Sequence, residues 1–146
     1  MKATDSDRFV VDASVALSWC LKEDKSAFGE WILDRLSEGA CAVVPSLWFF
    51  ETTNTLLVAE RRKRISPAQS AAFLESLASF NIEIDNISLP RVFDRVMSEA
   101  RGWGLTAYDT AYLELASRLG LPLATLDDAL KKAAKSVGIA LLRHSH

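Results

Sequence analysis

Short apolar runs alternate with longer segments of helical periodicity along most of this 146-residue chain. Apolar residues three or four positions apart predict amphipathic helices, and short runs of β-branched residues predict buried strands. The predicted strands are residues 8–11, 41–44, 82–85, 123–125 and 139–142. Residues 15–21 are predicted to form a short helix or a turn. The predicted helices are residues 26–38, 47–62, 66–79, 89–101, 106–119 and 128–137, several of them ended by the glycines at 39, 102, 120 and 138.

Strands that alternate with helices in this way indicate an α/β fold with a mostly parallel sheet. We expect a three-layer α/β/α arrangement in which helices cover both sides of four or five strands. The chain contains no internal repeat and no linker rich in Gly, Ser or Pro. We therefore expect one domain, residues 1–146, in which the polar residues 1–7 form a flexible N-terminal extension.

The composition is that of an ordinary soluble protein, with 49% apolar and 25% charged residues. The net charge of −2 and the pI of about 5.7 predict no strongly basic surface, so the overall charge does not by itself indicate nucleic acid. The N-terminal residues lack the apolar segment of a signal peptide, and no apolar run is long enough to span a membrane. We expect a cytoplasmic protein.

Cysteine and histidine supply little of the chemistry. Cys20 and Cys41 do not have the spacing of a structural zinc site, and we expect them to be reduced thiols. The only histidines, His144 and His146, lie at the C-terminal end. We therefore do not expect a histidine-based triad, and acid–base chemistry would have to come from carboxylates.

Two aspartates lie where predicted strands end. Asp12 directly follows the first strand, and Asp127 comes two residues after the fourth. A small hydroxyl residue, Ser14, lies two positions beyond Asp12. Since the functional residues of open parallel sheets gather beyond the carboxyl ends of the strands, Asp12 and Asp127 are candidates for one site.

Two further carboxylates lie on apolar faces of predicted helices. At about 100° per residue, Glu51 shares a face with Leu47, Asn54 and Val58, and Asp109 shares one with Leu105, Tyr112, Leu113 and Ala116. The polar side of the second helix is assigned to Thr106, Thr110, Glu114, Ser117 and Arg118. Burying an ionised carboxylate without a partner costs several kcal/mol. Each acid therefore requires a hydrogen-bond network, a cationic side chain or a metal ion.

Few basic residues are expected near these four acids. The nearest in sequence, residues 61–64, Arg118 and Lys131, fall on other helix faces or beyond the helix ends. A cluster of carboxylates with few cations is a typical setting for Mg²⁺ or Mn²⁺, which prefer oxygen ligands and keep several waters. Such an ion can activate water and stabilise charge on a phosphate.

Four segments together carry a family resemblance. They are VDAS at 11–14, PSLWFFE at 45–51, LTAYDTAY at 105–112 and TLD at 125–127. Each alone is a weak signal, but in this order and at these spacings they resemble the PIN domain, most closely the toxin ribonucleases of the VapC type. The resemblance covers the chain apart from about seven N-terminal residues.

The resemblance implies a four-carboxylate site that hydrolyses RNA phosphodiester bonds with Mg²⁺ or Mn²⁺. Asp12 would be the central metal ligand, supported by Ser14, and Asp109 a second direct ligand. Glu51 and Asp127 would bind the metal directly or through water, and one of them would orient or deprotonate the attacking water. Asp128 is expected to be a solvated acid in the first turn of its helix.

The resemblance also implies protein partners. It predicts a homodimer and a small antitoxin that blocks the site, and we expect no membrane partner. The helix of residues 47–62 is apolar nearly all round, which fits either an interface or burial within the subunit. The basic run at residues 61–64 is expected to solvate the end of that helix rather than to contact phosphate.

Two other functions stay open at this point. A haloacid-dehalogenase-like phosphotransferase also uses an aspartate after its first strand, but it requires a second aspartate where this chain has Ser14. A non-catalytic interaction domain on the same fold would have to retain four acids without a metal, at a cost in stability.

Overall fold

The computed structural model describes residues 7–21 and 25–144. Apart from Asp7, the expected N-terminal extension lies outside the described residues, as does His146. Among the described residues, no helix has both the length and the apolar character needed to cross a membrane.

The sheet is fully parallel and has four strands. The strands are β1 (Arg8–Val11), β2 (Cys41–Pro45), β3 (Ile82–Asp85) and β4 (Leu123–Ala124), in the spatial order β3-β2-β1-β4. β1 lies in the centre, where Val10 pairs with Val43 of β2 and with Leu123 of β4. The carboxyl ends of β1 and β4 are therefore neighbours.

The prediction of a fifth strand at residues 139–142 is wrong, because this segment does not form a strand. Its contact with the sheet is a single parallel bridge between Leu141 and Leu123. Two backbone hydrogen bonds hold it, from Leu123 N to Ala140 O at 2.9 Å and from Leu142 N to Leu123 O at 2.8 Å. Because β4 itself is only two residues long, there is no edge along which this segment can extend the pairing.

The helices begin and end close to the predicted positions. Ser66 and Gln69 form a reciprocal capping box at one start, and left-handed Gly120 ends another helix at its predicted position. The helices are α1 (Ala13–Cys20), α2 (Ala27–Ser37), α3 (Leu47–Arg61), α4 (Pro67–Ala78), α5 (Leu89–Arg91), the π-helical segment η3 (Val92–Val96), α6 (Met97–Trp103), α7 (Ala107–Leu119) and α8 (Asp128–Ser136).

The helix predicted over residues 89–101 differs in two ways. Its centre is the π-helical segment η3, and it continues through Gly102 to end at Gly104. Gly104 has a left-handed φ of 70°, and the next amide, Leu105 N, donates to Ala100 O at 3.0 Å. The helix ends at Gly104 because this glycine adopts the left-handed conformation, whereas Gly102 remains helical.

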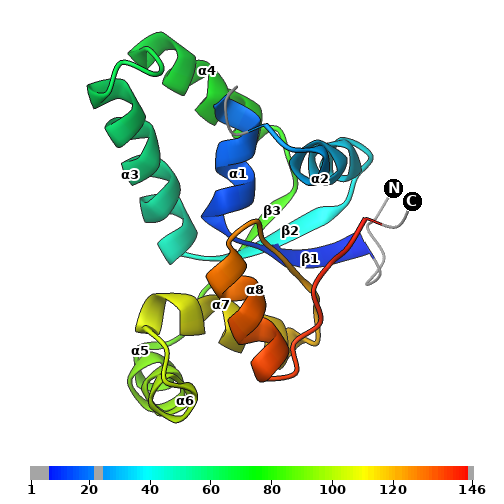
Figure 1. Cartoon of the computed structure of the whole chain (residues 1–146), viewed down its shortest axis with the longest axis vertical. Helices are drawn as coiled ribbons and strands as arrows, with labels where there is room; N and C mark the ends of the chain where they lie inside the picture. Colours follow the sequence, from blue (N-terminus) through cyan, green and yellow to red (C-terminus); the bar gives the residue numbers. More distant parts are fainter. Residues whose placement is uncertain (1–6, 22–24, 145–146) are drawn as a thin grey trace.

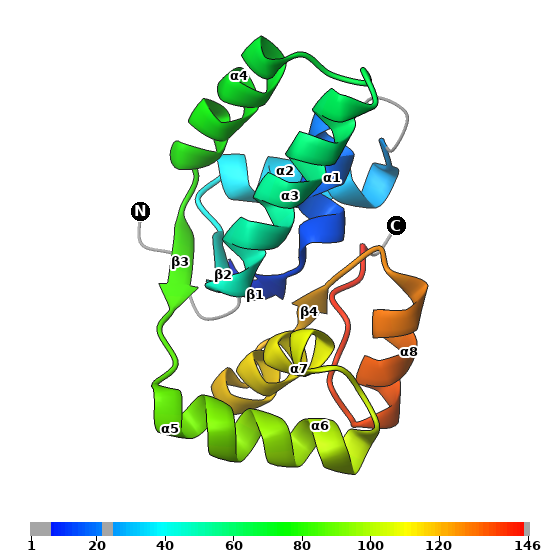
Figure 2. The same ribbon diagram turned by 90° about the vertical axis from the view of Figure 1, so that its left-hand side faces the viewer.

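The three layers are visible in two perpendicular views (Figures 1 and 2). Helices α1 to α4 lie on one side of the strands, and α5 to α8 lie on the other. This confirms the predicted α/β/α arrangement. Parallel strands are covered on both faces, so their side chains are apolar in both directions.

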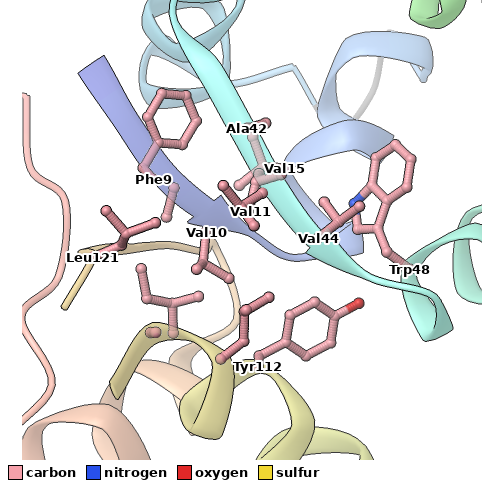
Figure 3. Close-up of a cluster of buried hydrophobic side chains, with 14 of the residues drawn as sticks. Phe9, Val10, Val11, Val15, Ala42, Val44, Trp48, Tyr112 and Leu121 are labelled. Atoms are coloured by element: carbon pink, nitrogen blue, oxygen red, sulfur yellow. The ribbon is translucent and has the colours of Figure 1, made fainter. Parts of the chain in front are cut away.

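The centre of the core is β1, whose residues Phe9, Val10 and Val11 are fully buried. Figure 3 shows Phe9 and Val11 on the side of β1 that carries Val15 of α1, and Val10 on the side of Tyr112 of α7. The strand is therefore fixed from both faces. This packing places the residue that follows Val11 at a defined point beyond the sheet.

Candidate active site

Asp12 lies at the carboxyl end of β1 and is 5% exposed. Two hydroxyl groups fix its carboxylate: Ser14 Oγ donates to Oδ1 at 2.6 Å, and Thr125 Oγ1 donates to Oδ2 at 2.6 Å. The first donor comes from the start of α1 and the second from the residue after β4. Both carboxylate oxygens are thus oriented by protein groups, as predicted for Ser14; the role of Thr125 was not predicted.

The same two hydroxyls connect β1 to the loop between β4 and α8. Ser14 Oγ accepts a hydrogen bond from Leu126 N at 2.9 Å, and Thr125 Oγ1 accepts one from Asp127 N at 3.0 Å. Each hydroxyl therefore donates to Asp12 and accepts from the β4–α8 loop. This arrangement places Asp127 close to Asp12 although the two are far apart in sequence.

Burial raises the pKa of Asp12 to about 6. The hydrogen bonds from Ser14 and Thr125 and the amide of Val15 oppose that increase, whereas the charge of Asp127 adds to it. The net direction shows that desolvation outweighs the hydrogen bonds. The site holds an ionised Asp12 at a cost, which a bound cation would offset.

Asp109 lies in the first turn of α7 and is half-buried. Thr106 caps this helix by accepting a hydrogen bond from Asp109 N at 3.1 Å. Burial raises the pKa of Asp109, and the charge of Asp127 raises it further. Asp127 therefore acts on both Asp12 and Asp109, which places it within electrostatic reach of each.

Glu51 joins this group through Tyr112. The Tyr112 hydroxyl donates a hydrogen bond to Glu51 Oε1, and the tyrosine is 3% exposed. Burial raises the pKa of Tyr112, and so do the nearby charges of Glu51, Asp12 and Asp109. The four predicted carboxylates are thus linked to one another through Asp127 and Tyr112.

The buried face of α3 differs from the prediction. Its buried residues are Trp48, Thr52, Leu56 and Ala59, whereas Asn54 is exposed and Glu51 lies at the margin. Helical periodicity cannot show which face of α3 is buried, because apolar residues occur on all sides of this helix. Glu51 is held near the site by Tyr112 rather than by burial beneath the sheet.

Asp127 and Asp128 have different surroundings. Asp127 caps α8, since its Oδ1 accepts a hydrogen bond from Ala129 N at 2.9 Å. The side chain of Asp128 is 99% exposed and lies 3.8 Å from Lys131 Nζ. As expected, Asp128 is a solvated acid in the first helical turn.

The prediction for the polar side of α7 is wrong at two positions. Thr110 is fully buried and Glu114 is 2% exposed. Arg118 binds Glu114 through Nε to Oε1 at 2.8 Å, and it reaches Asp85 of β3 through Nη2 to Oδ2 at 2.5 Å. Arg91 adds a longer contact, 3.7 Å from its Nε to Glu114 Oε1. A buried ion network therefore links α7 to β3 and α5. The Glu114–Arg118 spacing of four residues was the only local signal.

No lysine or arginine neutralises the four site carboxylates within the described part of the chain. The basic residues 61–64 are exposed at the opposite end of α3 from Glu51 (Figure 1). Over residues 7–21 and 25–144, no three His, Cys, Asp or Glu side chains are close enough to enclose a metal ion as they stand. The oxygen donors still fit Mg²⁺ or Mn²⁺, because Mg²⁺ usually takes one or two carboxylates and keeps several waters.

A small parallel α/β domain with carboxylates gathered beyond β1 and β4 is the class of protein that these observations define. A family model described as "PIN domain" matches residues 9–136. The chain belongs to the PIN domain family.

Two known proteins are similar over most of the chain. Ribonuclease VapC3 of Pyrobaculum aerophilum is 29% identical over 123 residues, which are 84% of this chain and 92% of that protein. The crystal structure of PAE2754 from Pyrobaculum aerophilum superposes with a TM-score of 0.67 at 25% identity, covering 90% of this chain and 87% of that one. These similarities agree with the predicted VapC-type member of the family.

Proposed function

We propose that this protein is a divalent-metal-dependent endoribonuclease that hydrolyses RNA phosphodiester bonds, and that it is the toxin of a type II toxin–antitoxin pair. The observation that carries the proposal is the buried Asp12, oriented by two hydroxyls and lying near carboxylates that have no lysine or arginine partner among the described residues. A relative named as a VapC ribonuclease supports RNA as the substrate. A cytoplasmic location is part of this proposal.

Asp12 and Asp109 would hold Mg²⁺ or Mn²⁺ directly, and Glu51 and Asp127 would do so directly or through water. When bound, such an ion polarises the phosphodiester and lowers the pKa of water. Ser14 and Thr125 keep both oxygens of Asp12 in place. Tyr112 orients Glu51 by donating to its Oε1, and either Glu51 or Asp127 would orient or deprotonate the attacking water.

The partners in this proposal are a cognate antitoxin and a second copy of the chain. On α3, the apolar side chains of Phe49, Phe50 and Leu57 are exposed by 38%, 75% and 41%. Trp48 and Leu56 of the same helix are buried within the subunit. Burial within the subunit therefore accounts for Trp48 and Leu56, and the exposed side chains would supply the proposed interface.

The metal requirement has a direct test. We expect RNA cleavage in the presence of Mn²⁺ or Mg²⁺. Cleavage should stop when EDTA is added and resume when the ion is restored in excess, because carboxylates without a bound cation repel phosphate. Cleavage is measured on a labelled single-stranded RNA by gel electrophoresis. Full activity in EDTA would contradict the proposal. Absence of any divalent-ion binding by calorimetry would favour the non-catalytic interaction domain instead.

Tyr112→Phe is expected to weaken Mn²⁺ binding by about tenfold and to reduce cleavage. Residues that orient a metal ligand are typically worth 10- to 100-fold in affinity or activity, and Tyr112 holds Glu51. The substitution keeps the buried ring, so the fold is preserved. Tyr108→Phe is the matched control, because Tyr108 lies in the same helix and is 64% exposed. Equal metal affinities for the two variants would remove Tyr112 from the site.

A further inference from the structure

A second feature adjoins the acidic site on the far side of Thr125. It is a cavity of about 470 Å³, which we name the β4–α8 pocket. The lining residues that matter are Phe28, Thr125, Leu126, Lys131, Lys135 and Arg143. They come from α2, the end of β4, α8 and the C-terminal segment, which runs beside α8 in Figure 1. The volume lies within the usual range for small-molecule sites.

The charge of the β4–α8 pocket is opposite to that of the acidic site. Lys131, Lys135 and Arg143 line it, and no aspartate or glutamate of the described residues does. Lys131 and Lys135 are one helical turn apart, so both face the same way from α8. In a chain of net charge −2, three cations around one cavity are a local concentration of positive charge. An anionic ligand is therefore favoured there.

The pocket also has an apolar part. Phe28 and Leu126 line it and are half-buried. The Phe28 ring packs against Trp31 with centroids 5.8 Å apart, and this contact helps to fix the position of the Phe28 ring. An aromatic face beside cations is the combination that binds single-stranded nucleic acid, with the base against the ring and the phosphate against lysine or arginine.

The two sites share a wall. Thr125 lines the pocket while its hydroxyl donates to Asp12, and Leu126 lines the pocket while its amide donates to Ser14. A chain molecule held at Asp12 would therefore have the pocket beside it, on the other side of Thr125 and Leu126. A polyanion such as RNA meets the acids with one phosphate and the cations with another.

We propose that the β4–α8 pocket binds the RNA nucleotide adjacent to the phosphodiester that is cleaved. Lys131, Lys135 and Arg143 bind its phosphate, and Phe28 packs against its base. This inference rests on the proposed ribonuclease function and adds to it the surface that positions the substrate. Because Asp12 repels phosphate in the absence of metal, the pocket supplies the attraction that the acidic site lacks.

The test is binding of a short fluorescein-labelled single-stranded oligoribonucleotide, followed by anisotropy in EDTA so that no cleavage occurs. Lys131→Gln combined with Lys135→Gln is expected to weaken binding by about tenfold. The slope of log affinity against log salt should decrease by about 0.7, since the three cations bind one phosphate and each phosphate contact contributes about 0.7 for single strands. Phe28→Leu should weaken binding by about fivefold with little change in slope.

Lys132→Gln is the matched control, since Lys132 is an exposed lysine of α8 outside the pocket lining. Equal affinities and salt slopes for the double variant and this control would overturn the inference. If wild-type protein cleaves RNA while the double variant binds like the control, only the pocket is wrong. If binding depends on the two lysines but no metal supports cleavage, the pocket stands and the proposed function fails.

Discussion

Asp12→Asn is expected to reduce metal-dependent RNA cleavage by about a thousandfold while making the metal-free protein more stable. The loss follows from removing the charge of the central ligand. The gain in stability follows from the buried carboxyl, whose pKa is raised from 3.8 to about 6 in the folded protein. Near neutral pH, this increase in pKa corresponds to a gain of about 3 kcal/mol in the free energy of unfolding.

The contribution of Asp12 to the free energy of unfolding depends on pH. Between about pH 4 and pH 6 the folded protein binds a proton at Asp12 that the unfolded chain has released. The contribution of Asp12 to stability therefore falls as pH rises through this window and stays low above it. An asparagine side chain does not titrate, so denaturant unfolding of the variant should lack this component, and the difference from wild type should be largest near neutral pH.

The control for this substitution is Asp128→Asn, which removes a neighbouring acid whose side chain is 99% exposed. It should change neither cleavage nor stability by much, because an exposed carboxylate is solvated by water in both the folded and the unfolded protein. A variant of Asp12 that keeps full Mn²⁺-dependent activity would refute the site. Lower stability together with lower activity would mean that the carboxylate serves the fold instead.

Arg118→Met is expected to lower the free energy of unfolding by about 3 kcal/mol. Glu114 is 2% exposed, and after the substitution its only cationic neighbour among the described residues is Arg91, at 3.7 Å. An almost uncompensated buried charge typically costs 3–5 kcal/mol. Methionine keeps most of the side-chain volume, so the cost is electrostatic. Thermal unfolding should shift downward by about 10 °C.

Arg95→Met provides the comparison, because Arg95 and Glu99 form an ion pair with the same spacing of four residues. The Arg95 side chain is 52% exposed, and its loss should cost less than about 0.5 kcal/mol. Adding Glu114→Gln to Arg118→Met should restore part of the lost stability by removing the unpaired charge. Equal destabilisation by Arg118→Met and Arg95→Met would show that the network is effectively solvated.

Most of the fold and the identity of the four acids could be predicted from the sequence. Buried strands and capped helices have local signatures, and Asp12 and Asp127 follow apolar strands whose ends meet in a parallel sheet. The prediction of Asp109 on the inner side of α7 also rests on periodicity alone. Their role as ligands and catalytic groups stays a prediction.

The residues that were missed act through partners distant in sequence. Glu114 looks like a solvent-facing acid because Asp85 and Arg91, which complete its network, lie on other elements. Thr125 looks like an ordinary strand residue until β4 is placed beside β1. Tyr112 belongs to the predicted apolar face, which is correct, but its hydroxyl reaches Glu51 on another helix. Periodicity shows which face of one helix or strand is apolar, and it gives no information about hydrogen bonds between different elements.

The separation of Asp12 from its donor Thr125 by 113 residues has a consequence for biosynthesis. On the ribosome, the first strand and its aspartate emerge early, whereas β4 follows only when most of the chain has been translated. A nascent chain lacking β4 has Asp12 without the Thr125 hydroxyl and without Asp127. The proposed nuclease site is therefore incomplete throughout most of its own translation, and it can form only after β4 has been synthesised.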